Sequence, residues 1–192
     1  MPIKGAVATE VLSKRWLSLW KHMSSANISD APYITEDIFE PITIQDEADL
    51  QGLNSFVTAI LPKLVSMKTL RICLAFEDSN IAALAVPQVR NWIDMVINRG
   101  VELERVDVTC YLLTEEPFHL AVLPVEVIRC ETLTSLDLYG IVIDNFNFPN
   151  LPLLKSLQVM YCTFSEDVLF PSLTMHNRDS HIFFTLPLKE LW

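Results

Sequence analysis

Leu133-Thr-Ser-Leu136-Asp-Leu138 is the stretch that decides the predicted fold, because its apolar spacing recurs along the chain. The pattern L-x-x-L-x-L, with Met, Ile or Val replacing some leucines, occurs at 67–72, 103–108, 133–138 and 154–159. Alternate residues of a strand point to opposite faces, so stacking such strands side by side buries a continuous apolar ladder. These ordered copies predict an α/β fold, a short solenoid of about four strand-containing repeats, with an irregular α/β domain as the alternative.

The segments between and after these strands differ in length and composition. The apolar spacing at 87–98 predicts a helix with Gly100 at its C-terminal end, and 122–129 fits a shorter helical turn. The stretch 148–154 is too rich in proline for much helix. The leucine-rich pattern continues after the second, third and fourth of these copies. The continuing positions are Tyr111 and Leu113, Ile141 and Ile143, and Cys162 and Phe164.

The N-terminal third follows a different pattern. Residues 5–22 predict a helix with one broad apolar face that includes Trp16 and Trp20. Residues 24–49 are polar and acidic, which favours a loop or an irregular linking segment. A second helix is expected over 49–61, with Pro62 ending it.

Composition and charge narrow the class of protein. The net charge is −10, and residues 1–22 carry +3, so the rest of the chain carries −13. An acidic body repels phosphate backbones and anionic membranes, so we expect neither a nucleic-acid nor a membrane partner. No apolar run is long enough for a membrane span, and we see no signal peptide. The four cysteines form no C-x-x-C pair, so we expect reduced, mostly buried thiols in a cytosolic or nuclear protein.

No known catalytic motif occurs in the sequence. The four histidines do not form H-E-x-x-H, and neither G-x-S-x-G nor a Walker loop is present. We therefore predict a binding protein, not an enzyme, with no catalytic residues, no cofactor and no metal site.

Several segments resemble plant F-box proteins with leucine-rich repeats, the F-box/RNI-like or FBD-associated group. Ser13-Lys-Arg-Trp16, followed by Leu19-Trp20, resembles the end of that F-box. Arg99-Gly-Val-Glu-Leu103 and Cys130-Glu-Thr-Leu133 resemble two later segments of the family. The first half of the F-box, which begins L-P-x-x-x-L, has no counterpart in this sequence.

The resemblance implies a substrate-recognition subunit of an SCF-type ubiquitin ligase, with the chemistry in other subunits. The F-box would dock on a Skp-type adaptor of a cullin-based ligase, and the repeats would hold an unknown target protein. A truncated F-box is expected to bury less apolar area against the adaptor and to bind it weakly or not at all. The candidate adaptor-binding residues are Val11, Leu12, Trp16 and Leu19, unless these side chains pack on the first repeat instead.

The resemblance also divides the chain into an F-box remnant (1–23), a linker and helix (24–62), a leucine-rich-repeat solenoid (63–173) and a divergent C-terminal tail or cap (174–192). Strand residues that alternate with the buried ladder would line the concave face. The candidate target-binding residues on that face are Arg71, Arg105, Asp107, Asp137, Tyr139 and Gln158, with ordinary solvated strand surface as the alternative. A second functional hypothesis is an adaptor-independent binding module or a non-functional truncated gene product.

Overall fold

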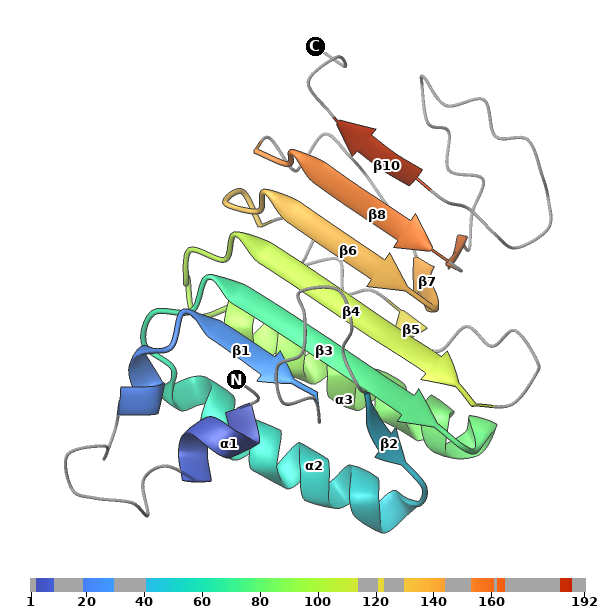
Figure 1. The fold of residues 1–192 in the computed structure, drawn as a ribbon. Coiled ribbons are helices and arrows are strands. Elements are labelled where there is room, and N and C mark those ends of the chain that lie inside the picture. The colour runs from blue at the N-terminus through green and yellow to red at the C-terminus, as the bar shows by residue number, and fades with distance from the viewer. Residues whose placement is uncertain are drawn as a thin grey trace.

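The computed structural model of the chain describes residues 3–8, 19–29, 41–113, 121–122, 130–143, 153–160, 162–164 and 184–187. Its fold is α/β, with a parallel sheet and two long helices on one side of it (Figure 1). The helical elements are α1 (Ile3–Ala8), η2 (Leu19–His22), α2 (Glu47–Ile60), η3 (Leu61–Lys63) and α3 (Ser79–Ile97). The strands are β1 (Ser25–Ile28), β2 (Ile42–Ile44), β3 (Thr69–Phe76), β4 (Arg105–Leu112), β5 (Ala121–Val122), β6 (Ser135–Tyr139), β7 (Ile141–Ile143), β8 (Ser156–Met160), β9 (Thr163–Phe164) and β10 (Phe184–Pro187).

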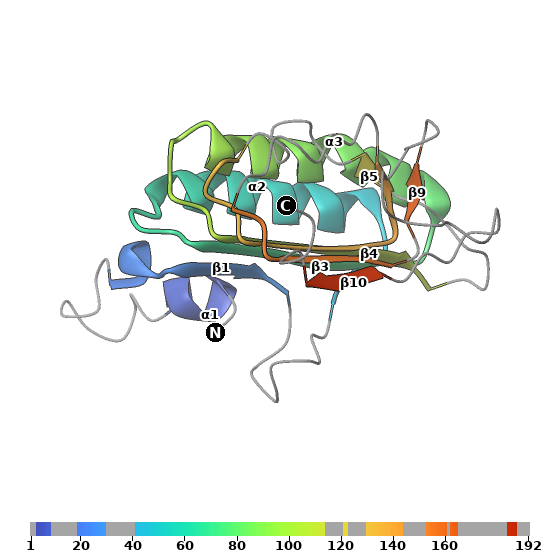
Figure 2. The ribbon, with the colours of Figure 1, turned by 90° about the horizontal axis from the view of Figure 1, so that it is seen from above.

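The main sheet has the strand order β1-β3-β4-β6-β8-β10. Strand β2 pairs with the second half of β3, on the same side of β3 as β1. All neighbours are parallel except β10, which runs antiparallel to β8. Figure 2 shows α2 and α3 on one side of this sheet and α1 on the other. The arrangement is compatible with a leucine-rich-repeat fold, in which parallel strands stack and the chain returns over one face.

The four predicted strands are confirmed as β3, β4, β6 and β8, and they pair in the register that the apolar pattern requires. Leu136 lies opposite Val106 on one side and opposite Leu157 on the other. One further pairing, of Leu70 with Val106, completes the first row of the ladder. Ile72, Val108, Leu138 and Val159 form the second row, and all eight side chains are buried. This ladder is the centre of the hydrophobic core.

A fifth copy of the same spacing lies at Met23, Ala26 and Ile28, in a segment that we expected to be a loop or linker. That expectation is wrong for β1 and β2, both of which join the sheet. Ala26 pairs with Leu70 and is fully buried. Its small side chain is only a weak apolar signal, so the sequence does not predict a strand at this position.

The starts of β3, β4, β6 and β8 are fixed by one repeated backbone contact. A carbonyl of the preceding strand unit accepts hydrogen bonds from two successive N–H groups of the next unit. The accepting carbonyls are those of Ser24, Lys68, Glu104 and Thr134, and the donors are the pairs 68 and 69, 104 and 105, 134 and 135, and 155 and 156. The repetition of one contact at each step keeps the strands in register.

The expected helix at 49–61 is confirmed as α2, which begins two residues earlier. Asp46 caps its N-terminus by accepting a hydrogen bond from the Asp49 backbone N–H at 2.9 Å. Pro62 lies in the short 3-10 turn η3 that follows.

Helix α3 begins eight residues before the predicted start at Pro87. Asp78 caps it through the backbone N–H groups of Asn80 and Ile81. Pro87 lies inside the helix on an exposed position, where the missing N–H is tolerated better than in the core. Gly100 follows the helix with a φ of 66°, as a C-terminal glycine should.

The predicted helix at 5–22 is only partly described. Residues 3–8 form α1, and 19–22 form the 3-10 turn η2, so the prediction of an α-helix is wrong for the last four residues. The stretch 9–18 lies outside the described residues. Trp20 is buried in the main core, and Val7 packs against the same core.

Beyond β6, a small second sheet continues the leucine-rich pattern. Its order is β5-β7-β9, all parallel, and the chain passes from β6 of the main sheet into β7 at Gly140, which has a φ of 69°. The buried side chains of Ile141 and Cys162 confirm the extended pattern in the third and fourth units. The extension is wrong in the second unit, because Leu113 is 54% exposed.

Two predicted segments are described only in part. Of the expected helical turn at 122–129, only Val122 is described, and it belongs to strand β5. In the C-terminal tail, β10 pairs along the outer edge of β8, which covers the backbone of that edge strand.

Candidate functional site

The candidate site is the polar face of the sheet, which we define as the side opposite α2 and α3. Register places Arg71, Asp107, Asp137 and Gln158 in one row across β3, β4, β6 and β8. A parallel row nearer the strand starts contains Arg105, and a third row contains Tyr139. The structure therefore brings all six predicted target-binding residues together on one face, although their role in binding stays a prediction.

The first ion pair on this face joins neighbouring strands. Arg71 Nε donates to Asp107 Oδ2 at 2.7 Å, and the two side chains are 18% and 14% exposed. Burial raises the pKa of the Asp107 carboxyl above its ordinary value, and the nearby Arg71 guanidinium opposes that rise without cancelling it. The Asp107 carboxyl therefore loses its proton less readily than the carboxyl of an exposed aspartate.

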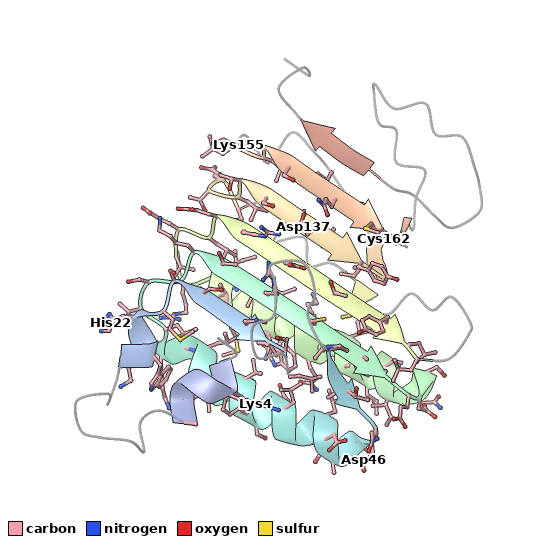
Figure 3. The ribbon with its side chains drawn as sticks, in the orientation of Figure 1. Lys4, His22, Asp46, Asp137, Lys155 and Cys162 are labelled. Atoms are coloured by element: carbon pink, nitrogen blue, oxygen red, sulfur yellow. The ribbon has the colours of Figure 1, made fainter. Side chains whose placement is uncertain are left out.

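A second ion pair crosses the sheet one strand farther on. Arg105 Nη2 donates to Asp137 Oδ2 at 2.6 Å, and the arginine side chain is 44% exposed, whereas that of Asp137 is 14% exposed. Asp137 lies on β6, between β4 and β8 in the interior of the sheet (Figure 3). The pair is diagonal, since Arg105 lies directly opposite Ser135. Directly before β3 and β4, Lys68 Nζ and Glu104 Oε1 form a third, more exposed pair at 2.5 Å.

An aromatic cluster lies near the ends of the same strands. The rings of Tyr111 and Tyr139 meet edge to face, with centroids 6.3 Å apart and an interplanar angle of 79°. Met160 pairs with Tyr139 in the register of β6 and β8. Burial raises the pKa of Tyr111 to about 12, so its hydroxyl is protonated at neutral pH. Sequence reasoning missed Tyr111 and Met160, although the period of two along each strand predicts their face.

The predicted adaptor-binding residues are not brought together by the described part of the chain. Val11, Leu12 and Trp16 lie outside the described residues, and Leu19 lies in η2. Their role stays a prediction.

The Cys130-Glu-Thr-Leu133 segment has a clear structural role. Thr132 Oγ1 donates to the Leu103 carbonyl oxygen at 2.8 Å, and the Cys130 thiol approaches the same oxygen at 3.7 Å. Thr134 Oγ1 donates to the Glu104 carbonyl oxygen at 2.9 Å. These side chains tie the start of β6 to the start of β4.

A hollow that sequence reasoning did not anticipate lies where α1, β2 and α2 meet. Its volume is about 490 Å³, and most of its lining is apolar. Lys4 of α1 and Asp49 of α2 are the charged residues among its lining, and Figure 3 shows Lys4 on the short helix.

The four cysteines are buried and form no disulfide, as expected. Burial raises the pKa of the Cys73 thiol to about 12 and that of Cys162 to about 11, so both are protonated at neutral pH. Within the described residues, no group of three or more His, Cys, Asp or Glu side chains could hold a metal ion. None of the described helices is long and apolar enough to cross a membrane.

Comparison with known proteins supports the family resemblance. An FBD-associated F-box protein of Arabidopsis thaliana is 30% identical over 176 residues, which is 90% of this chain and 33% of the relative. An F-box/FBD/LRR-repeat protein and F-box/LRR-repeat protein 13 of the same plant are each 26% identical, over 90% and 88% of this chain. The chain spans about a third of the length of these relatives.

No family model and no solved structure matches this chain. The relatives are nevertheless consistent, because further Arabidopsis proteins with F-box and FBD in their names match about 90% of the chain at 24–25% identity. The leucine-rich spacing, the parallel sheet and these matches agree, and the chain is a relative of the plant F-box proteins with leucine-rich repeats, the FBD-associated group.

Proposed function

We propose that this chain is the repeat-containing part of a substrate receptor for an SCF-type ubiquitin ligase, and that its polar face holds the target protein. In this proposal the strand units beginning at Met23, Met67, Leu103, Leu133 and Leu154 form a short leucine-rich-repeat domain. The ligase chemistry lies in other subunits, so the chain acts as a binding protein without a cofactor.

The observation that carries the proposal is the continuity of the polar face. Six charged, amide or aromatic side chains gather on one side of β3, β4, β6 and β8, while the other side is entirely apolar along its two ladder rows. Arginine and tyrosine are enriched where binding energy is concentrated in protein interfaces. The Arg71–Asp107 ion pair, in which both side chains are mostly buried, holds these two side chains in position before a partner arrives, which lowers the entropic cost of binding.

The test of target binding is a triple variant, Arg105→Ala, Asp107→Ala and Tyr139→Ala, used as bait in plant cell extract. Partners recovered by the unchanged chain are expected to be lost, while the far-ultraviolet circular dichroism spectrum stays the same. Arg90→Ala together with Gln88→Ala, on α3 and away from the polar face, is the matched control and is expected to retain the partners. Equal recovery by the triple variant would reject the polar face as the binding site.

We further propose that the N-terminal segment docks on a Skp-type adaptor, with Val11, Leu12, Trp16 and Leu19 as the contact residues. The names of the relatives support this part of the proposal, since the term F-box occurs in each name. Adaptor docking is tested by mixing the chain with purified adaptor and separating the mixture by size-exclusion chromatography. A stable complex that is lost in Trp16→Ala is expected, and elution of two separate proteins would contradict adaptor docking.

One observation favours the alternative of an adaptor-independent binding module. Trp20 is 4% exposed within the core, and Val7 packs against that core, so some apolar side chains of this segment are already used inside the domain. A chain that recovers targets through its polar face but shows no complex with the adaptor would support this alternative.

A further inference from the structure

We propose that the polar face binds a basic side chain, an arginine or a lysine of the target protein, between the Asp137 carboxylate and the ring of Tyr139. This inference rests on the proposed target-binding function and names the chemistry of the segment that is recognised.

The first observation is a shortage of hydrogen-bond donors around Asp137. Its Oδ2 accepts from Arg105, but Oδ1 is buried and has no donor within reach among the described residues. A buried acceptor without a partner is costly, because it has lost its hydrogen bonds to water. A guanidinium or ammonium group from a target would supply the missing donor and a compensating charge.

The second observation is the position of the carboxylates relative to one another. Asp107 and Asp137 lie directly opposite on neighbouring parallel strands, so two negative charges face each other across the sheet. Such like-charge pairs are unfavourable unless a cation lies nearby. Arg71 contacts Asp107 from the β3 side, and Arg105 contacts Asp137 from the row nearer the strand starts. The opposite direction, toward the strand ends, leads to the aromatic cluster.

The third observation is that Tyr139 follows Asp137 by two residues on the same strand and the same face. That spacing separates the two side chains by about 7 Å, so a cation bound at Asp137 comes within reach of the Tyr139 ring. Tyr111 meets Tyr139 edge to face and holds its ring in place. The hydroxyl of Tyr111 is protonated at neutral pH, so this neighbouring ring carries no charge.

Access to this position is controlled by Arg105. Its side chain is 44% exposed, and its ion pair with Asp137 is therefore partly screened by solvent. A long and half-exposed arginine can change rotamer at little cost, which opens the solvent side of Asp137 to an incoming donor.

An acidic side chain would instead meet Asp107 and Asp137 and be repelled by both. The net charge of −10 on the chain also attracts basic segments over longer distances.

The inference is tested with random heptapeptides displayed on phage and selected against the full chain. Selected peptides that compete with one another bind the same site, and these peptides are expected to share an arginine or a lysine. Replacing that arginine by citrulline, which keeps the shape and removes the charge, should weaken binding by about tenfold or more. Asp137→Asn in the chain should weaken it by a similar factor, and Arg90→Ala, on the exposed side of α3, should leave it unchanged.

The outcomes separate this inference from the proposed function. Peptides that are lost in the Arg105, Asp107 and Tyr139 triple variant but bind without a basic residue overturn the basic anchor and leave the polar face as a binding site. A selection in which no peptide depends on these polar-face residues overturns both. If Asp137→Asn does not fold, the citrulline peptide still decides the question, since it needs no change in the chain.

Discussion

The ladder face and the polar face are built from alternate residues of the same four strands, β3, β4, β6 and β8, yet they differ in burial and in chemistry. Leu136 is fully buried against Val106 and Leu157, whereas its neighbour Asp137 pairs with the half-exposed Arg105. The ladder supplies hydrophobic stabilisation in proportion to the apolar area it buries. Partly exposed ion pairs contribute little to stability. Because the two faces alternate along each strand, substitutions on the ladder face are expected to alter folding, and substitutions on the polar face are expected to alter binding.

The largest expected effect comes from breaking the ladder at its centre. Leu136→Ala leaves a cavity between three strands and should lower the free energy of unfolding by about 2–5 kcal/mol. Urea denaturation followed by circular dichroism measures this loss. The adjacent Ser135→Ala, on the polar face, is the control and should change the free energy by no more than about 0.5 kcal/mol. Similar losses in both variants would remove the distinction between the two faces.

The second prediction concerns Gly140, in the turn that joins the main sheet to the second sheet. A Cβ at this position would overlap the carbonyl oxygen of Cys110, and its φ of 69° disfavours any L side chain. Left-handed backbone and overpacking together predict a loss of about 2–4 kcal/mol for Gly140→Ala.

Gly100 provides a matched control for that variant. It has a similar φ of 66°, but nothing lies within 4 Å of an added Cβ. Gly100→Ala should therefore cost only the backbone term, about 1–2 kcal/mol. Thermal denaturation of both variants gives the comparison, and a larger loss at Gly100 would contradict the role assigned to the contact with Cys110.

A smaller effect is expected at the contact between strand units. Thr132→Val keeps the side-chain shape and removes the hydrogen bond to the Leu103 carbonyl, so it should cost about 0.5–1.5 kcal/mol. The exposed Thr43 on β2 is the control, and Thr43→Val should be close to neutral. Denaturant midpoints measured at one protein concentration distinguish the two. An unchanged midpoint for Thr132→Val would show that this bond does not hold the units together.

The smallest effect concerns the pH dependence of stability at Asp107. Burial raises the pKa of this carboxyl in the folded chain above the value of about 3.9 expected in the unfolded chain. Between these two values the folded chain binds more protons, so the contribution of Asp107 to stability falls as the pH rises through that window. Asp107→Asn cannot titrate, and the stability difference between wild type and variant should shift against the wild type as the pH rises. A shift in the opposite direction would contradict the dominance of burial over Arg71.

The sequence predicts the ladder well because its spacing repeats. Leu70, Val106, Leu136 and Leu157 form one row as expected, and the helix at α2 is found within two residues of its predicted start. Strand β1 escaped prediction because Ala26 is a weak apolar signal within a polar segment, although the spacing from Met23 to Ile28 matches the other units. The start of α3 was missed because Pro87 favours a helix start, and the cap that decides it is Asp78.

The polar face is only partly predictable. Alternation places Arg71, Asp107, Asp137 and Tyr139 on one side of the sheet without a structure. The partners cannot be read from alternation, since Arg105 reaches diagonally past Ser135 to Asp137, and this choice depends on strand register and rotamer. The edge-to-face pairing of Tyr111 with Tyr139 depends on the same register.

The central claim is that a target protein lies against the polar face, and site-specific photo-crosslinking tests it most directly. A benzophenone amino acid replaces Gln158, which is exposed on that face, or Arg90, which is exposed on α3. After irradiation with a partner recovered by the unchanged chain, we predict a crosslinked product from position 158 and none from position 90. Crosslinking from position 90 alone would place the partner on the helical side and contradict the account.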